Sequence, residues 1–527
     1  MQSTDSIEKS GGRWSDTVPA HLDPRYSLRE LECEPRELVS VCYRLTSEQG
    51  HHFAGLIVQE GPSVLELRYV FYADWPSGWT HVLVRQLPTN RTFPSISDGI
   101  HAADWHEREA EDLFDIVFEG HPHLGDFVLH NDRWQENLGP MRPGFDGRNP
   151  VARREPDLHW QPRRIVQAEG AFAMPIGPIY SGVTESVQFL LETVGEDVIR
   201  TIPRLFYQYR AVEKIAEGRA TEDVLLLAER FAATTAFAHA LAFCQALESI
   251  CGVVTPPRAC ALRVLLAELE RFRHHVGAIQ EICESTALVV ANNQVAILEE
   301  ELLRLSCSFT GHRYLFGLTI CGGLSKPLED ADCHEAVNQA RGILKRLNAL
   351  EKLLYDSSSF LDRLEEVGIV QESDARSYGL VGPIARASGV ARDLRKVQPY
   401  SGYDSLTLDV PCEQEGDGYA RLRVLFAETK QSVSMMEQAA AALSPGPVHA
   451  TEVVIRPGAA LGWVEAPRGA AFHWLSIGED RRVDRYHLVT PSFSNWHGFH
   501  LAAENFAFQD FPIILATFGL SVAENDR

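Results

Sequence analysis

The stretch from Ala220 to Cys283 constrains the fold of this 527-residue chain more than any other segment. Residues 221–251 are rich in Ala and Leu, and apolar residues recur at spacings of three and four. This pattern predicts a helix that is buried on most of its circumference. Pro256 and Pro257 end that helix, and a second run of similar character follows them. Two such helices joined by a short corner predict an antiparallel pair in a helical bundle.

The composition narrows the class of protein. A hydrophobic content of 45% and a charged content of 23% are ordinary for a globular chain, and the length allows two or more domains. No run approaches the roughly 18 uncharged apolar residues that a membrane-spanning helix needs. The first residues also lack the basic-then-apolar pattern of a secretory signal. We therefore expect a cytoplasmic chain whose membrane role, where it has one, comes through partner subunits.

Charge and cysteine usage exclude further classes. The net charge of −23 disfavours binding to nucleic acid or to anionic lipid surfaces. None of the ten cysteines falls in a CxxC pair. Cys244, Cys251 and Cys260 lie along the two predicted helices and are expected to be small buried hydrophobes. The sequence therefore predicts a reducing cytoplasm, with neither a disulfide framework nor an iron–sulfur cluster held by this chain.

The chain divides into a small and a large predicted domain of α+β class. Residues 1–25 are polar and expected to be flexible, and residues 131–165 are a linker rich in Pro and Arg. Between them, residues 26–130 predict a small α/β domain with strand-length segments at 38–47, 51–60, 63–72 and 80–89. Residues 166–527 predict a large, mainly helical bundle with peripheral β-structure. That peripheral part includes a β-hairpin within residues 456–477.

Two segments resemble known proteins. RFAATTAFAH at 230–239, with the helix after the Pro-Pro corner, resembles the core of two related large subunits. One belongs to the membrane-bound nickel–iron hydrogenases of the formate-hydrogenlyase type, and the other to the quinone module of respiratory complex I. ADWHEREAEDLFDIVFEGHPHL at 103–124 resembles the signature of the small quinone-module subunit, with Asp115 where a Gly is usual. The resemblance runs from about residue 30 to the C-terminus and implies a fused small-plus-large subunit.

The resemblance also locates four metal-ligand positions. In the hydrogenases the motif Arg-x-Cys-Gly-x-Cys-x-x-x-His and a C-terminal Asp-Pro-Cys-x-x-Cys hold nickel and iron. Alignment to these motifs puts Ala232 and Thr235 at the first two cysteine positions, and Ser521 and Glu524 at the last two. Nickel and iron in such a site need soft, anionic thiolates. The resemblance therefore implies the scaffold without a nickel–iron centre.

The resemblance to complex I implies an acceptor pocket for a quinone or a related molecule. Its expected lining is Tyr180, Thr184, Ala233, Thr235 and Ser521. In complex I a histidine and a tyrosine meet the quinone headgroup, and the matching positions here hold Thr184 and Ala233. Another histidine of the same loop is replaced by Tyr180.

Three residues are candidates for proton exchange. Glu213 matches the glutamate of the Arg-Gly-x-Glu segment that begins a proton route in hydrogenases, while His239 and Glu524 are ionisable groups of the expected cavity. A second interpretation stays open for two of them. Glu213 would be a helix-surface ion pair with Arg210 or Lys214, and His239 would be a core histidine with its hydrogen bonds satisfied.

Two groups of charges have other expected roles. The resemblance places Arg210, Arg219 and Arg258 towards an iron–sulfur cluster on a partner subunit. The acidic and basic residues of 104–112 predict an ion-pair network against the neighbouring domain rather than an acid–base site.

Two functions follow from the resemblance. In the first, the chain is a subunit of a membrane-attached, complex I-like NADH:quinone-type oxidoreductase that translocates protons or other ions. Its partners would be an iron–sulfur small subunit, antiporter-like membrane subunits and other arm subunits, on the inner face of the cell membrane. In the second, it is a structural coupling subunit without chemistry of its own. An active hydrogenase is contradicted by the missing cysteines.

Overall fold

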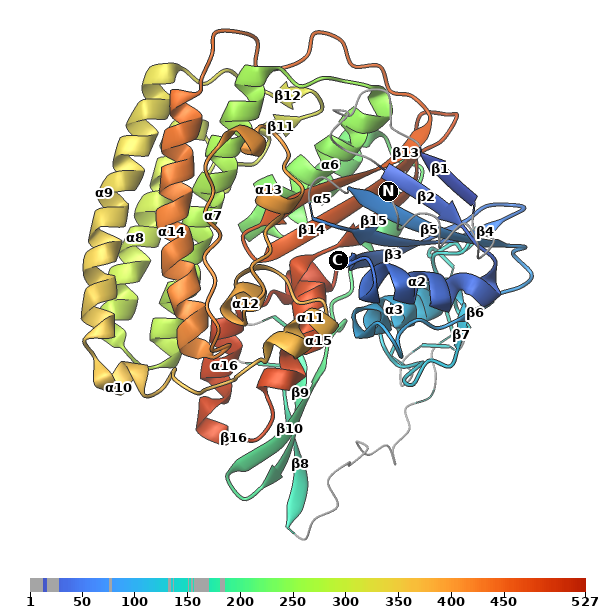
Figure 1. The fold of residues 1–527 in the computed structure, drawn as a ribbon, viewed down its shortest axis with the longest axis horizontal. Coiled ribbons are helices and arrows are strands. Elements are labelled where there is room, and N and C mark those ends of the chain that lie inside the picture. Colours follow the sequence, from blue (N-terminus) through green and yellow to red (C-terminus); the bar gives the residue numbers. More distant parts are fainter. Residues whose placement is uncertain are drawn as a thin grey trace.

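The computed structural model describes residues 13–16, 28–74, 78–130, 134–135, 137–149, 151–152, 155, 170–180 and 185–527. Figure 1 shows a sheet domain on one side, a bundle of long helices on the other, and a second sheet between them. The predicted α+β class is confirmed. That middle sheet has three antiparallel strands, β13 (Gly458–Ala466), β14 (Gly469–Ile477) and β15 (Val483–Val489).

The N-terminal domain is built on a five-stranded sheet of order β1-β2-β5-β4-β3. Only the β2–β5 pair is parallel. The strands are β1 (Arg13–Asp16), β2 (Leu28–Glu32), β3 (His52–Glu60), β4 (Leu65–Tyr72) and β5 (Trp79–Gln86). The other elements are η1 (Pro35–Glu37), α2 (Leu38–Ser47), β6 (Thr92–Pro94), η2 (His101–Ala103), α3 (Asp104–Phe114) and β7 (Val117–Glu119). Within residues 1–25, which are expected to be flexible, Arg13–Asp16 form β1 and pair with β2. The remainder of that segment lies outside the described residues.

One predicted strand is a helix. Residues 38–47 form α2, which buries Leu38, Val41, Cys42 and Leu45. These positions recur at spacings of three and four, which is the period of a helix rather than of a strand. The β-branched and aromatic residues of the segment favoured a strand, whereas the spacing of its apolar residues corresponds to the helix that forms. The segments within 51–60, 63–72 and 80–89 do form β3, β4 and β5.

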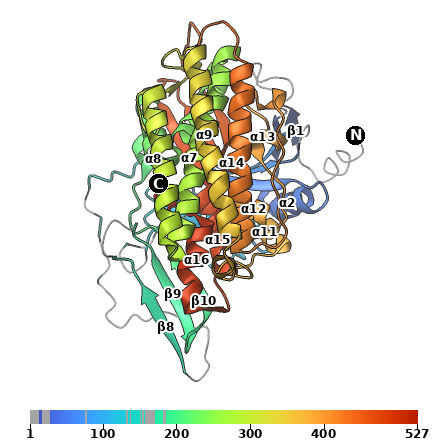
Figure 2. The same cartoon turned by 90° about the vertical axis from the view of Figure 1, so that its left-hand side faces the viewer.

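Four long helices make the bundle of the large domain and lie side by side in Figure 2. They are α7 (Pro257–Ser285), α8 (Val289–Thr310), α9 (Asp330–Tyr355) and α14 (Gly418–Ala441). α7 packs against both α14 and α8, and α16 (Phe511–Phe518) closes one end. The helix predicted after the Pro-Pro corner is therefore confirmed as α7, the central helix of the bundle.

The helix predicted over 221–251 is broken. α5 (Thr221–Arg230) and α6 (Ala236–Cys251) meet at an angle of 104° across η3 (Ala233–Thr235). Side chains replace the hydrogen bonds that the break removes: Arg210 Nη1 donates to the Phe231 carbonyl over 2.9 Å. At the other side, the Glu270 carboxylate accepts from the Phe237 and Ala238 amides at 2.8 and 3.0 Å. Because these partners come from distant segments, local periodicity gave no sign of the bend.

The first helix also packs differently from the prediction. α6 lies mainly on β13 and β14 rather than along α7. At Gly462 on β13 an added Cβ would lie 1.9 Å from the Ala242 carbonyl oxygen of α6. The absence of a side chain at this position therefore lets the helix approach the sheet closely.

The remaining elements surround this core. A four-stranded sheet, order β16-β10-β9-β8, projects from one end of the molecule (Figure 1). Its strands are β8 (Ala171–Ile176), β9 (Gln188–Val194), β10 (Asp197–Arg204) and β16 (Phe506–Ala507). The short elements are α4 (Val212–Ala216), β11 (Thr319–Ile320), β12 (Gly323–Leu324), α10 (Ser358–Leu361), α11 (Glu372–Ser377), α12 (Gly382–Ala387), α13 (Leu394–Val397), η4 (Tyr403–Ser405), α15 (Pro491–Ala502), η5 (Phe508–Asp510) and α17 (Val522–Asn525).

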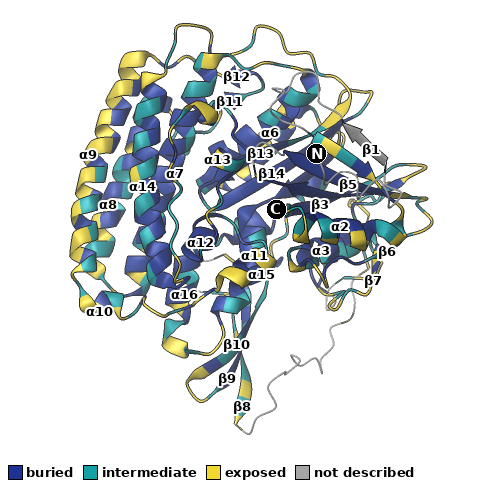
Figure 3. Cartoon of the chain, in the orientation of Figure 1, coloured by how far each residue is buried: buried dark blue, intermediate teal, exposed yellow. Residues whose placement is uncertain are grey.

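Burial follows this layering. In Figure 3 the middle sheet is dark blue, whereas the outer faces of α8 and α9 are largely exposed. Every residue of β14 is buried. In a strand with one face in water, buried and exposed residues would alternate. The middle sheet is covered on both faces because the helical layer packs on one and the N-terminal domain on the other. Within the described ranges, no single helix is long and apolar enough to cross a membrane, and only the bent pair α5 and η3–α6 meets that criterion when counted together.

We predict opposite effects for two glycine-to-alanine changes. Gly462→Ala places a methyl group against the α6 backbone and should lower the free energy of unfolding by about 1–3 kcal/mol, the usual result of overpacking. Gly342→Ala, at a position on α9 with no atom within 4 Å of the added Cβ, should raise it by about 0.5–1 kcal/mol. Denaturant titration of the two variants measures both changes. Equal stability of the two proteins would contradict the close contact between α6 and β13.

Candidate functional site

The Glu524 carboxylate lies at the centre of the molecule, where α17 meets the bend between α5 and α6. Its Oε1 accepts hydrogen bonds from Thr235 Oγ1 at 2.7 Å and Arg468 Nη1 at 3.0 Å. Its Oε2 accepts one from Ser492 Oγ at 2.5 Å. Burial opposes ionisation of this group, but Arg468 and its other partners outweigh burial and hold the pKa of Glu524 well below its usual range. The carboxylate is therefore ionised and fully enclosed by donors.

Hydrogen bonds from the tail fix this carboxylate in place. Ser521 Oγ accepts from the Glu524 amide at 3.1 Å, so this hydroxyl caps the short helix α17. Thr490 Oγ1 donates to the Glu524 carbonyl at 3.0 Å. Ser492 Oγ also accepts from the Ser521 amide at 3.2 Å. The structure thus brings Thr235, Ser521 and Glu524 together, although the first is remote in sequence from the other two.

A row of hydrogen-bonded rings leads away from Glu524. His239 Nε2 lies 3.8 Å from Glu524 Oε1, and His239 Nδ1 lies 3.0 Å from His473 Nε2. His473 Nδ1 is in turn 2.8 Å from the Tyr486 hydroxyl. All four residues are completely buried, and burial lowers the pKa of His473 well below its usual value. An imidazole in such a row can accept a proton on one nitrogen and release one from the other.

Glu213 belongs to a second buried cluster, on α4 against β15. Its carboxylate lies 2.8 Å from Arg485 Nη1 and 3.1 Å from His487 Nδ1, and accepts from the Leu488 amide at 3.0 Å. Burial raises the pKa of Glu213, but His487 and Arg485 outweigh burial and hold it well below the usual value. The surface ion-pair interpretation of Glu213 is wrong, because this side chain is 1% exposed.

This second cluster joins the two domains. Arg527 Nη2 donates to both carboxylate oxygens of Glu109 on α3, at 2.8 and 3.0 Å, and Arg527 Nε lies 3.4 Å from Glu213. Arg485 Nε donates to the Val58 carbonyl on β3 at 3.1 Å. The predicted ion-pair network is therefore confirmed for Glu109. Glu107, by contrast, stays within its own domain, where it accepts from Ser95 and Ile96, and burial raises its pKa to about 8.

The other predicted site residues that the structure describes have hydrogen-bond partners and surroundings of their own. The Tyr180 hydroxyl donates to the Val187 carbonyl at 2.8 Å within its own β-sheet region. Ala233 is exposed at the bend, and Thr184 lies outside the described residues. Arg210 holds the bend from outside, bonding the Phe231 carbonyl.

Two further arginines bond to backbone carbonyls near them. Arg219 donates to the Ile215 carbonyl at 2.7 Å, and Arg258 to the Leu328 carbonyl at 2.7 Å. These bonds anchor the two side chains at the places where they lie, and their orientation towards a partner molecule stays a prediction.

Sequence reasoning missed the residues that pair with Glu213 and Glu524. These partners are Arg468, Arg485, His487, Ser492 and Arg527. The sequence of β15 could have indicated them, because Arg485 and His487 are two positions apart and so share one face of the strand with Val483 and Val489. Charged residues at such positions are expensive to bury alone, so they indicate a buried partner.

Two family models match the chain. The model described as "Respiratory-chain NADH dehydrogenase, 30 Kd subunit" matches residues 31–151. The model described as "Respiratory-chain NADH dehydrogenase, 49 Kd subunit" matches residues 294–457 and 451–527.

Individual proteins are also similar to this chain. Formate hydrogenlyase subunit 5 of Escherichia coli (strain K12) is 29% identical over 454 residues, which is 85% of this chain and 79% of the relative. The C/D subunit of NADH-quinone oxidoreductase from Bdellovibrio bacteriovorus is 32% identical over 343 residues, which is 64% of this chain and 60% of the relative. Hydrogenase-4 component G of E. coli (strain K12) is 26% identical over 442 residues, which is 83% of this chain and 76% of the relative.

We predict that Glu213→Gln costs the isolated chain about 3–5 kcal/mol of unfolding free energy, because it leaves buried guanidinium charge without its anion. The matched control is Glu217→Gln, four positions on, where the half-buried carboxylate pairs with Lys214 at 2.7 Å. Its cost should stay below about 1 kcal/mol. Chemical denaturation at neutral pH measures both.

The pH dependence gives an independent check. Since the pKa of Glu213 is lowered on folding, its stabilisation is fully present above the unfolded value of about 4.3 and is lost as the pH falls through the folded value. The wild-type chain should therefore lose stability more steeply below about pH 4.3 than Glu213→Gln does. Parallel curves would contradict the assignment.

Proposed function

The chain belongs to the family of fused 30 kDa- and 49 kDa-type complex I subunits and their hydrogenase-type relatives, and from its central cluster we propose its role. It is the catalytic-arm subunit of a membrane-attached oxidoreductase, and it works without a nickel–iron centre. Electrons reach it through an iron–sulfur cluster on a partner subunit and leave on a quinone or a comparable acceptor.

The observation that carries this proposal is the chemistry of the Glu524 cluster. The four positions that hold thiolates in the hydrogenases here offer a methyl group, two hydroxyls and one carboxylate. The carboxylate is bonded to Thr235, Ser492 and Arg468, and the Ser521 hydroxyl caps α17. Nickel and iron need soft thiolates, two of them bridging, and this donor set does not fit them. The proposed electron and proton transfers therefore do not involve a nickel–iron centre.

The residues of the chain itself supply protons. Reduction of a quinone consumes two protons, and the row Tyr486–His473–His239 ends beside Glu524, the fixed negative charge of the site. In this proposal a proton from water reaches His239 by way of Tyr486 and His473. The His239 imidazolium then gives that proton to the acceptor and returns to its neutral form, once for each of the two protons. Glu524 stabilises the imidazolium that forms transiently. Glu213 bonds to β15, the strand that carries Tyr486, and adds a second buried carboxylate to this region.

The same proposal covers the surroundings of the site. From the family resemblance, we assign Tyr180, Ala233, Thr235 and Ser521 to the lining of the acceptor pocket. Thr184 is assigned to the same lining from its sequence position alone. Arg210, Arg219 and Arg258 face the iron–sulfur small subunit. Antiporter-like membrane subunits and other arm subunits complete the complex on the cytoplasmic face of the membrane and couple electron transfer to the translocation of protons or other ions.

One observation favours a second function, that of a structural coupling subunit without chemistry of its own. Thr235, His239 and Glu524 are each 0% exposed in the chain by itself, and every oxygen of the carboxylate already has a donor. Such a cluster stabilises the packing of the C-terminal tail against the α5–α6 bend and the β13–β14 hairpin. This stabilisation does not require an acceptor molecule.

Glu524→Gln in the purified complex tests the two functions. If His239 and Glu524 handle protons, quinone reduction should fall by about 10²-fold or more, the usual loss of an acid–base group. The control Glu504→Gln, at an exposed residue, should keep the wild-type rate. An unchanged rate in a correctly assembled Glu524→Gln complex would select the structural function. Metal analysis of the wild-type complex should find nickel well below one per chain, and stoichiometric nickel would overturn the donor-set argument.

A further inference from the structure

A cavity of about 400 Å³ opens between the two domains, away from the Glu524 cluster. Both domains contribute walls to it, and the residues that matter most are His52, Phe53, Tyr72, Arg376, Arg392 and Phe472. Clefts of this size at domain boundaries are where proteins usually bind drug-sized ligands.

The cavity is electropositive in an acidic protein. Its described lining includes two arginines and two histidines but no aspartate or glutamate, whereas the whole chain has a net charge of −23. Arg376 is neutralised by Glu372 on its own helix at 2.7 Å. In the part of the chain that the structure describes, Arg392 has no carboxylate within ion-pair distance. Positive charge without a counterion beside a low-dielectric wall concentrates anions.

Neutral partners hold the Arg392 guanidinium in position. Its Nη2 lies 2.5 Å from His52 Nε2, and its Cζ lies 6.0 Å from the centre of the Tyr72 ring. Burial, followed by the charge of Arg392, lowers the pKa of His52 to about 3, so this imidazole is uncharged and accepts the hydrogen bond. A guanidinium has five N–H donors, and these contacts leave most of them for a ligand.

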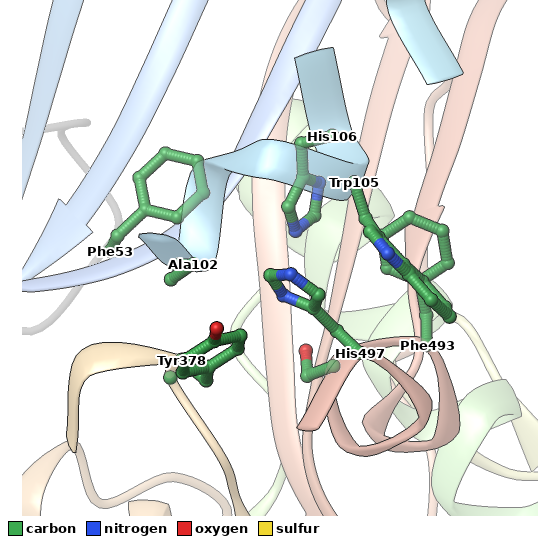
Figure 4. Close-up of a pocket in the computed structure, with 10 residues that line it drawn as sticks. Phe53, Ala102, Trp105, His106, Tyr378, Phe493 and His497 are labelled. Carbon is green, nitrogen blue, oxygen red and sulfur yellow. The ribbon is translucent and has the colours of Figure 1, made fainter. Parts of the chain in front are cut away.

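The deeper part of the cavity is aromatic. Phe53 and Ala102 are shared with an adjoining small pocket, shown in Figure 4, in which His106 points down from α3 and His497 points up towards it. Trp105, Phe493 and Tyr378 surround the two imidazoles (Figure 4). In the wider cavity Phe472, whose ring centre lies 6.1 Å from that of Tyr72, continues this aromatic surface. A ligand that reaches Arg392 therefore has flat apolar surface beside it.

We propose that this cavity binds an organic anion whose carboxylate or phosphate pairs with Arg392 and whose aromatic body packs on Phe53, Tyr72 and Phe472. The inference is independent of the redox role proposed above, since none of these residues belongs to the Glu524 or Glu213 clusters.

Calorimetric titration of the full chain tests it with three probes that share one ring system: 1-naphthoate, 1-naphthyl phosphate and the neutral 1-naphthalenemethanol. At least one anion should bind at a single site and more tightly than the alcohol. The tighter of the two anions identifies the acidic group as a carboxylate or a phosphate. Arg392→Gln should weaken that binding by about ten- to a hundredfold, the usual loss of a hydrogen bond to a charged group. Arg392→Lys should lose less.

Two further variants separate binding from folding. Arg346→Gln removes an exposed guanidinium on α9, outside this cavity, and should leave affinity unchanged. Ser377→Trp fills the cavity from an exposed helix position and should abolish binding while Arg392 remains. Binding of neither anion, equal binding of the alcohol, or undiminished affinity in Arg392→Gln or Ser377→Trp would overturn the proposal.

Discussion

A guanidinium that is taken out of water must be given an anion or a set of carbonyl oxygens, and much of this structure follows from that requirement. Arg395 is completely buried and bonds Asp393 at 2.6 Å and Glu268 at 2.9 Å. Arg386, equally buried, bonds Glu428 at 2.7 Å. In both cases at least one partner comes from a distant part of the chain. Each pair therefore determines the relative position of two separate segments. It does so more precisely than apolar contacts would, because apolar contacts have no preferred direction.

The Glu524 cluster is the same solution applied at the centre of the molecule. Arg468 and Glu524 hold the hairpin turn against the tail, and Thr235 adds the bend between α5 and α6. Hydrogen bonds and one ion pair therefore join three segments that are remote in sequence. Fold alone does not decide function, so the role proposed for this cluster depends on the chemistry of its own residues.

The sequence predicted correctly those elements whose conformation depends on neighbouring residues. Pro257 starts α7 after the predicted corner, and the β13–β14 hairpin forms within the segment predicted for it. The bend before α6 and the cluster partners Arg468 and His473 escaped prediction. Their conformations depend on residues that are remote in sequence, and no window of neighbouring residues contains that information. The position of Glu524 beside Thr235 was reached only through the family resemblance.

The domain boundary combines both kinds of constraint. On one side of it, Arg527 and Glu109 form a buried ion pair, and nearby lies the open cavity with its charged wall at Arg392. A small sliding of one domain past the other would separate the buried charges before any new partner came within reach, at a cost of several kcal/mol. Packed, charge-paired interfaces therefore have discrete arrangements rather than a continuum. The N-terminal domain is accordingly a fixed wall of the large domain, and a cavity enclosed by the two keeps its shape for as long as that ion pair holds.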